Sequence, residues 1–145
     1  MKTRKNTEEK HGKVQKTKLI YPELSYQVRG AIFTVYETLG PYHKELIYNN
    51  ALSEEFKKKK IPFKKEASIS VIYKGKKVGI YRPDFLVDNK IVIELKAAEK
   101  LPLNDEKQLS YYLNGSPYRL GFLVNFGAQN GIDIRRRIVG YNDEA

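Results

Sequence analysis

Apolar residues recur every three or four positions in the first half of the chain and every second position further along, which predicts helices followed by strands. The first helical stripe spans residues 24–39, and Gly40-Pro41 ends it. A second helix is expected from about residue 44 to residue 60, with lysines in its last turn, where cations suit the helix dipole.

Strand patterns begin at Phe63 and continue to the end of the chain, interrupted by one further helix. Lys74-Gly75-Lys76-Lys77 predicts a hairpin turn, Asn104 is the expected N-cap of the third helix, and Asn114-Gly115 is its expected end. The expected strands are residues 69–73, 78–87, 91–95, 120–126 and 132–139, with a helix over 105–113. This order indicates a mixed α and β class, built around a central sheet.

A three-residue loop at positions 88–90 gives the two strands around it a consistent register. One face of the pair is then apolar throughout, with Val87 opposite Ile91, Phe85 opposite Ile93, and Pro83 opposite Leu95. A two-residue loop would mix the faces, so the pattern itself selects this register.

The same register places Asp84 opposite Glu94 on the other face, with Lys96 two residues further along. Directly opposed residues have Cβ atoms roughly 5 Å apart, and two carboxylates that close repel unless a cation or a proton lies between them. A divalent metal with a neighbouring ammonium provides the parts needed for phosphodiester hydrolysis. The plainer alternative is that each carboxylate pairs with a base such as Arg82 or Lys96.

Composition narrows the metal and the partner. The chain has no cysteine and two histidines, so zinc is improbable and carboxylates favour Mg²⁺ or Mn²⁺. The net charge of +10 favours a polyanionic partner. Half of this charge lies in residues 1–18, which we expect to form a flexible basic arm preceding a single domain over residues 19–145.

These residues resemble a known superfamily. Pro83-Asp84, followed ten positions later by Glu94-Leu95-Lys96, resembles the PD-(D/E)XK nuclease motif, and the chain more narrowly resembles the GxxExxY proteins within that superfamily. The matching stretches, in order, are Leu39-Gly40-Pro41, Glu45-x-x-Tyr48-x-Asn50-Ala51-Leu52, Tyr81-Arg82-Pro83-Asp84, Glu94-Leu95-Lys96, Gln108-x-x-x-Tyr112-Leu113 and Asn125-Phe126-Gly127.

The resemblance implies a restriction-endonuclease-like core, with a central mixed sheet flanked by helices, and a nuclease that hydrolyses phosphodiester bonds. Asp84, Glu94 and the Leu95 carbonyl would be metal ligands, and Glu45 would complete the acidic cluster. Lys96 would position the attacking water, and Gln108 would help to hold metal, water or substrate. Glu45 heads an apolar stripe, so its carboxylate is expected to point inward.

The expected partner is nucleic acid, with DNA as the first candidate and RNA as the second, and a homodimer is compatible with the superfamily. The alternatives are a non-catalytic nucleic-acid-binding module and a subunit of a larger complex on the same fold. A membrane span and a secretory signal are not expected, so the default location is intracellular, cytoplasmic or nuclear.

Overall fold

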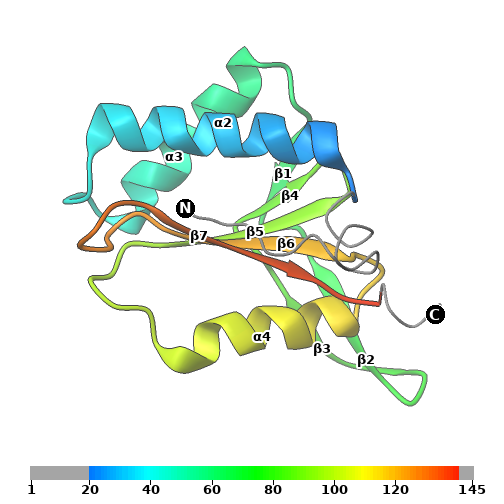
Figure 1. Cartoon of the computed structure of the whole chain (residues 1–145). Coiled ribbons are helices and arrows are strands. Elements are labelled where there is room, and N and C mark those ends of the chain that lie inside the picture. The colour runs from blue at the N-terminus through cyan, green and yellow to red at the C-terminus, as the bar shows by residue number, and fades with distance from the viewer. Residues whose placement is uncertain (1–19, 141–145) are drawn as a thin grey trace, which may run out of the picture.

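A five-stranded sheet covered by helices on both faces forms the centre of the protein (Figure 1). The computed structural model describes residues 20–140, so the expected basic arm lies outside the described residues. The elements are α2 (Pro22–Leu39), α3 (Glu45–Lys58), β1 (Phe63–Lys65), β2 (Ile69–Tyr73), β3 (Lys76–Tyr81), β4 (Phe85–Val87), β5 (Ile91–Lys96), α4 (Leu103–Asn114), β6 (Leu120–Asn125) and β7 (Asp133–Ile138).

The sheet is mixed, with the strand order β1-β4-β5-β6-β7. Strands β5 and β6 run parallel, and the other neighbouring pairs are antiparallel. A parallel pair needs a long connection, and α4 provides it by crossing from the end of β5 to the start of β6. The expected mixed sheet with flanking helices is therefore confirmed.

Side chains alternate between two cores, one on each face of the sheet. Helices α2 and α3 lie on one face and α4 on the other, as Figure 1 shows above and below the sheet. The strand residues of the α2–α3 core are Phe85, Val87, Ile91, Ile93, Leu95, Leu120, Phe122 and Val124. Those of the α4 core are Ile69, Tyr81, Leu86, Val92 and Leu123. Every position of β6 is buried, because both of its faces are covered.

The predicted helices are confirmed, but two expectations near them are wrong. Residues 78–87 do not form one strand: β3 ends at Tyr81 and pairs with β2 in a separate two-stranded sheet, and β4 begins at Phe85 in the main sheet. Pro83 lies in the break, where a residue without an N–H cannot continue a ladder. Helix α4 begins at Leu103 with Pro102 in the N-cap position, so Asn104 lies in its first turn and is not the cap.

Of the two predicted hairpin turns, the first is shorter than expected and the second has the expected length. Lys74-Gly75 alone separates β2 from β3, and both residues have positive φ, as a tight two-residue hairpin requires. The loop between β4 and β5 has the expected three residues, 88–90. Its register is also as predicted, with Val87 opposite Ile91 and Phe85 opposite Ile93.

Candidate active site

Asp84 is joined to the β5 backbone at the point where β4 begins. Its Oδ2 accepts a hydrogen bond of 2.7 Å from the Leu95 N–H. In an antiparallel ladder this N–H would face Pro83, two positions beyond the Phe85–Ile93 pair. The N–H and the carbonyl of one strand residue point to the same side, so the Leu95 carbonyl also faces Pro83, which has no N–H to donate. A proline at this position would therefore leave the Leu95 carbonyl without a ladder partner from this side of β5.

Glu94 is held from the opposite direction by a tyrosine. The Tyr81 hydroxyl donates to Glu94 Oε2 at 2.5 Å, and the Tyr81 ring stacks on Tyr112 of α4 with centroids 4.0 Å apart. Burial raises the pKa of Glu94 to about 7, and its contact with Asp84 also raises it, whereas the Tyr81 hydrogen bond and Lys96 oppose the shift. Burial and the carboxylates raise the pKa of Tyr81, so the phenol remains a donor.

Lys96 lies on the same face of β5 as Glu94, because the two residues are two positions apart. Its ammonium is 3.9 Å from Asp105 Oδ2, in the first turn of α4. The Lys96 backbone carbonyl accepts from the Phe126 N–H at 2.9 Å, which fixes this end of β5 to β6. The cation is therefore held at the side of the Asp84–Glu94 pair.

Glu45 is the first residue of α3 and reaches the same group of charges. Burial and repulsion from Asp84 raise the pKa of Glu45, while attraction to Lys96 lowers it. Glu45 as a residue is exposed and so does not lie inside the core as its place at the head of the apolar stripe suggested, but its carboxylate lies close to Asp84 and Lys96. A helix end lies at the rim of the core rather than inside it, which leaves the carboxylate facing both solvent and Asp84.

The turn before α3 is fixed by Tyr48, which is fully buried. Its hydroxyl donates to the Gly40 carbonyl and accepts from the His43 N–H, and its ring stacks on Phe126. Gly40 has φ of 72° and ψ of −170°, a conformation available in practice to glycine. Tyr48 thus has a structural role, and it sets where α3 and Glu45 begin.

Gln108 is exposed on α4, one turn from both Asp105 and Tyr112. Residues three and four apart share a helix face. Asp105 pairs with Lys96, and Tyr112 stacks on the tyrosine that bonds Glu94. Gln108 therefore lies on the stripe of α4 that faces the acidic group, with its side chain open to solvent.

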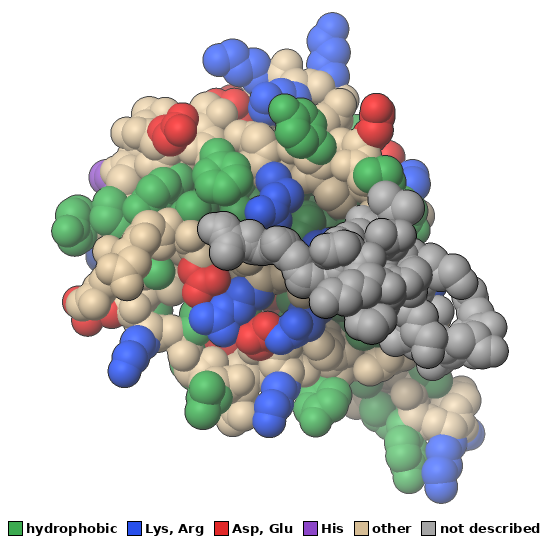
Figure 2. All heavy atoms as spheres, viewed as in Figure 1, with side chains coloured by type: hydrophobic (Ala, Val, Ile, Leu, Met, Phe, Trp, Pro, Cys, Tyr) green, Lys and Arg blue, Asp and Glu red, His purple; other side chains and the backbone are tan. Residues whose placement is uncertain are grey.

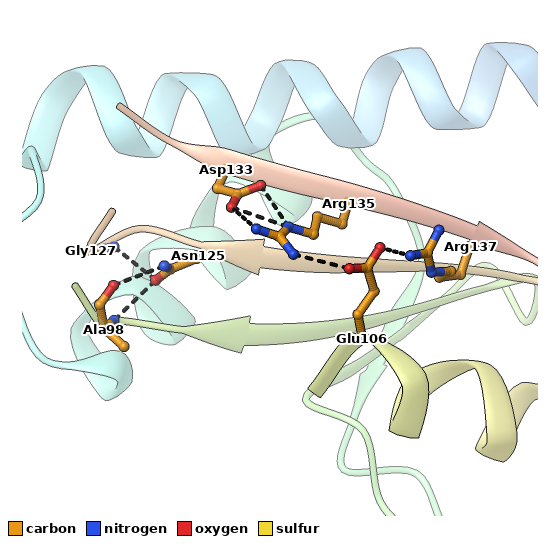
Figure 3. Close-up of polar contacts among 7 residues, drawn as sticks. All are labelled: Ala98, Glu106, Asn125, Gly127, Asp133, Arg135 and Arg137. Atoms are coloured by element: carbon orange, nitrogen blue, oxygen red, sulfur yellow. Dashed lines mark hydrogen bonds and ion pairs between the residues drawn. The ribbon is translucent and has the colours of Figure 1, made fainter. Parts of the chain in front are cut away.

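The loop after Lys96 is fastened to the end of β6. Asn125 is 1% exposed, and its side chain accepts from the Ala98 N–H at 3.0 Å and donates to the Ala98 carbonyl at 2.8 Å (Figure 3). Its Oδ1 also accepts from the Gly127 N–H. A Cβ added to Gly127 would be 2.7 Å from the Ala98 nitrogen, so glycine is required for this close approach. The two loops therefore form one unit.

The three consecutive arginines of β7 divide between the faces of the sheet, because successive strand residues point to opposite sides. Arg135 and Arg137 both contact Glu106 of α4, and Arg135 also bonds Asp133 (Figure 3). Burial and repulsion from Arg29 of α2 lower the pKa of Arg136, so it lies toward the opposite face. Arg135 and Arg137 therefore join β7 to α4 through Glu106.

Sequence reasoning missed Tyr81, Asp105 and Asn125 as part of this arrangement. Tyr81 and Asn125 are both part of the matching motifs. However, nothing in the spacing of these motifs predicts that Tyr81 holds Glu94 or that Asn125 holds the Ala98 loop. The sequence places Asp105 only at the start of the helix expected over 105–113. Its pairing with Lys96 depends on where α4 crosses β5, which is a tertiary feature.

Comparison with known families agrees with this geometry. The model of the PD-(D/E)XK nuclease superfamily matches residues 22–137. The chain therefore belongs to the PD-(D/E)XK nuclease superfamily, whose members generally hydrolyse phosphodiester bonds. No curated protein and no solved structure matches the chain significantly. Within residues 20–140 no helix is long and apolar enough to cross a membrane.

Proposed function

We propose that this protein is a divalent-metal-dependent nuclease that hydrolyses phosphodiester bonds, with DNA as its first candidate substrate and RNA as its second. The observation that carries the proposal is the contact between the Asp84 and Glu94 carboxyl groups, which helps to raise the pKa of Glu94 to about 7. Bringing two acids together is costly for stability, and Lys96 offsets this cost only in part. A cation bound between the two carboxylates would explain the arrangement. The motif matches also support the narrower relationship to the GxxExxY proteins.

The oxygen atoms present suit Mg²⁺ or Mn²⁺. Magnesium is typically held by one or two carboxylates and keeps several waters, so Asp84 and Glu94 form an adequate protein contribution. The Leu95 carbonyl, which faces the proline, is a further candidate ligand, and Glu45 approaches from the rim. Among residues 20–140 no three acidic or histidine side chains are already gathered as a ligand set, which is consistent with two side chains, a carbonyl and water.

The chain's own residues have separable roles in such a reaction. Tyr81 holds the Glu94 carboxylate in place, and the Leu95 N–H holds Asp84. Lys96 orients the attacking water and stabilises negative charge that develops on the phosphate, while Asp105 fixes the position of its ammonium. Glu45 and Gln108 lie at the open side, where they would contact water or substrate.

In the proposed hydrolysis the water oxygen forms a bond to phosphorus as the bond to the leaving oxygen breaks. A divalent metal held by Asp84 and Glu94 would supply polarisation of the phosphate and a lowered pKa for a water at neutral pH. The overall positive charge would attract the phosphate backbone.

The proposal is tested by incubating the wild type, Asp84→Ala and Lys96→Ala with labelled single- and double-stranded DNA and RNA. Each reaction is run with Mg²⁺, with Mn²⁺ and with a chelator, and Lys58→Ala is the control because Lys58 is an exposed lysine at the far end of α3. Cleavage should need metal, persist in the control and be lost in both site variants. A folded wild type that binds no divalent metal and cuts none of the four polymers would refute it.

The competing function is a non-catalytic nucleic-acid binder on the nuclease fold, for which the net charge of +10 alone would provide the attraction to phosphates. Such a protein would bind nucleic acid equally with and without metal and would release no product. Co-purification of a stoichiometric partner would instead indicate the complex-subunit role.

A further inference from the structure

A cavity of about 600 Å³ lies between α2 and the loop that joins β6 to β7. Its walls include Arg29 and Phe33 of α2, Glu99 and Lys100 beyond β5, and the β6–β7 loop from Ala128. This volume is within the usual range for small-ligand sites. None of the residues discussed so far as metal ligands lines it.

The cavity is connected to the acidic group through a short, fixed piece of chain. Lys100 follows Lys96 by four residues, a span of roughly 14 Å at most. Asn125 and Gly127 fasten the intervening Ala98 to the β6–β7 loop, so two walls of the cavity are held together (Figure 3). A nucleic-acid strand bound at the acidic group would therefore need to extend only a short distance to reach the cavity.

The cavity wall holds two cations, Arg29 and Lys100, and two acids, Glu99 and Asp133. Asp133 is paired with Arg135, whereas Glu99 accepts from the neutral Gln129 amide at 3.5 Å, so the wall keeps a small excess of positive charge. Both Arg29 and Lys100 line the cavity and could bind an anionic group there.

Helix α2 adds exposed aromatic rings on the same stripe. Phe33 is 41% exposed and Tyr26 is 80% exposed, seven residues apart with Arg29 between them. Figure 2 shows hydrophobic side chains along the α2 side of this face, above a mixed group of acidic and basic side chains. Aromatic rings that alternate with cations form the pattern on which unpaired bases stack.

We propose that this cavity is a nucleotide subsite for single-stranded nucleic acid, with the phosphate at Arg29 and Lys100 and a base on the Phe33 ring. Gln129 and Asn130 would offer side-chain amides to the base edge. The inference rests on the proposed function in taking nucleic acid as the ligand, and it adds a preference for an unpaired strand. A stacked base within a duplex would not offer its face to Phe33.

The test measures the affinity of fluorescein-labelled single-stranded oligothymidylate, and of a duplex of equal length, in the presence of a chelator. Phe33→Leu keeps an apolar side chain but removes the stacking surface, and Tyr111→Leu is the control because Tyr111 is 72% exposed on α4. Phe33→Leu should weaken single-strand binding roughly tenfold, with the duplex nearly unaffected. Lys100→Gln should reduce the slope of log K against log salt by roughly 0.7, and the exposed Lys107→Gln should not.

The outcomes separate this inference from the nuclease proposal, since the binding assay requires no cleavage. Unchanged single-strand affinity in Phe33→Leu, alongside metal-dependent cleavage by the wild type, would overturn the subsite and leave the nuclease standing. Weakened affinity in a protein that never cleaves would support the subsite on a binding module. A Phe33→Leu effect equal for duplex and single strand, or an effect on self-association instead, would overturn it.

Discussion

The Tyr81 hydroxyl donates a hydrogen bond of 2.5 Å to Glu94 Oε2, across 13 residues of sequence and between two different sheets. Because the Tyr81 ring also stacks on Tyr112, the β2–β3 hairpin, strand β5 and helix α4 meet at one carboxyl group. A group that holds a ligand without itself binding metal commonly contributes to metal affinity. Tyr81 is thus a positioning residue in the proposed site.

Replacing Tyr81 with Phe should weaken the apparent affinity for Mg²⁺ by roughly 10- to 100-fold, because Glu94 loses the donor that orients it. The ring and its stacking on Tyr112 would remain. The measurement is the cleavage rate as a function of metal concentration, and the rate at saturating metal should largely recover. Tyr112→Phe is the matched control, since it removes a phenol oxygen from the same stack without touching Glu94. Equal effects in both variants would contradict a positioning role for the Tyr81 hydroxyl.

The raised pKa of Glu94 predicts how the stability of the metal-free protein depends on pH. The unfolded carboxyl loses its proton near pH 4.5 and the folded one near pH 7, so between these values the folded state binds more protons. The free energy of unfolding should therefore fall as pH rises through this window, by up to about 3 kcal/mol. Chemical denaturation at several pH values measures this change.

Glu94→Gln provides the control for that pH dependence, since an amide does not titrate. Its free energy of unfolding should exceed that of the wild type increasingly from pH 4.5 to pH 7. Added Mg²⁺ should reverse the order at pH 7 and above, because protons and metal compete for the same carboxylate in the wild type. Parallel pH curves for the two proteins would contradict the assigned pKa.

Gly127 and Gly30 should respond oppositely to alanine. A Cβ at Gly127 would meet the Ala97 and Ala98 backbone within 3 Å, so Gly127→Ala should destabilise the fold by roughly 1–3 kcal/mol. A Cβ at Gly30, within α2, meets nothing within 4 Å, so Gly30→Ala should stabilise by roughly 0.5–1 kcal/mol. Thermal melts of the two variants measure the change in melting temperature. Equal changes for Gly127→Ala and Gly30→Ala would show that the close approach of Gly127 to Ala98 does not constrain the loop.

Local pattern predicted much of the fold and the central pair of acids. The register of Phe85 against Ile93 followed from turn length and the apolar face, because a slip by one residue would have exposed the core. The break at Pro83 was missed, since β3 and β4 together read as one apolar run. The exposure of Glu45 was also missed, because its place at the rim depends on how α3 lies against the sheet.

Side-chain contacts between distant elements were less accessible to sequence reasoning. The hydrogen bond from Tyr81 to Glu94 depends on how the β2–β3 hairpin packs against α4. The ion pair between Asp105 and Lys96 depends on the path of α4 between β5 and β6. The sequence predicts Asn125 only as part of a buried strand, whereas its side-chain amide forms hydrogen bonds with both the N–H and the carbonyl of Ala98. Such contacts follow from packing rather than from spacing along the chain.

The most direct test of the nuclease proposal is the rate of Mg²⁺-dependent cleavage of labelled DNA by the wild type, Asp84→Asn and Asp88→Asn. Asp88 is a turn acid with φ of 50°, a conformation that Asn also accepts, and it lies outside the acidic group. We expect cleavage by the wild type and Asp88→Asn, and a rate lower by roughly a hundredfold or more in Asp84→Asn. Cleavage by Asp84→Asn at the wild-type rate, or cleavage that persists in chelator, would contradict the account.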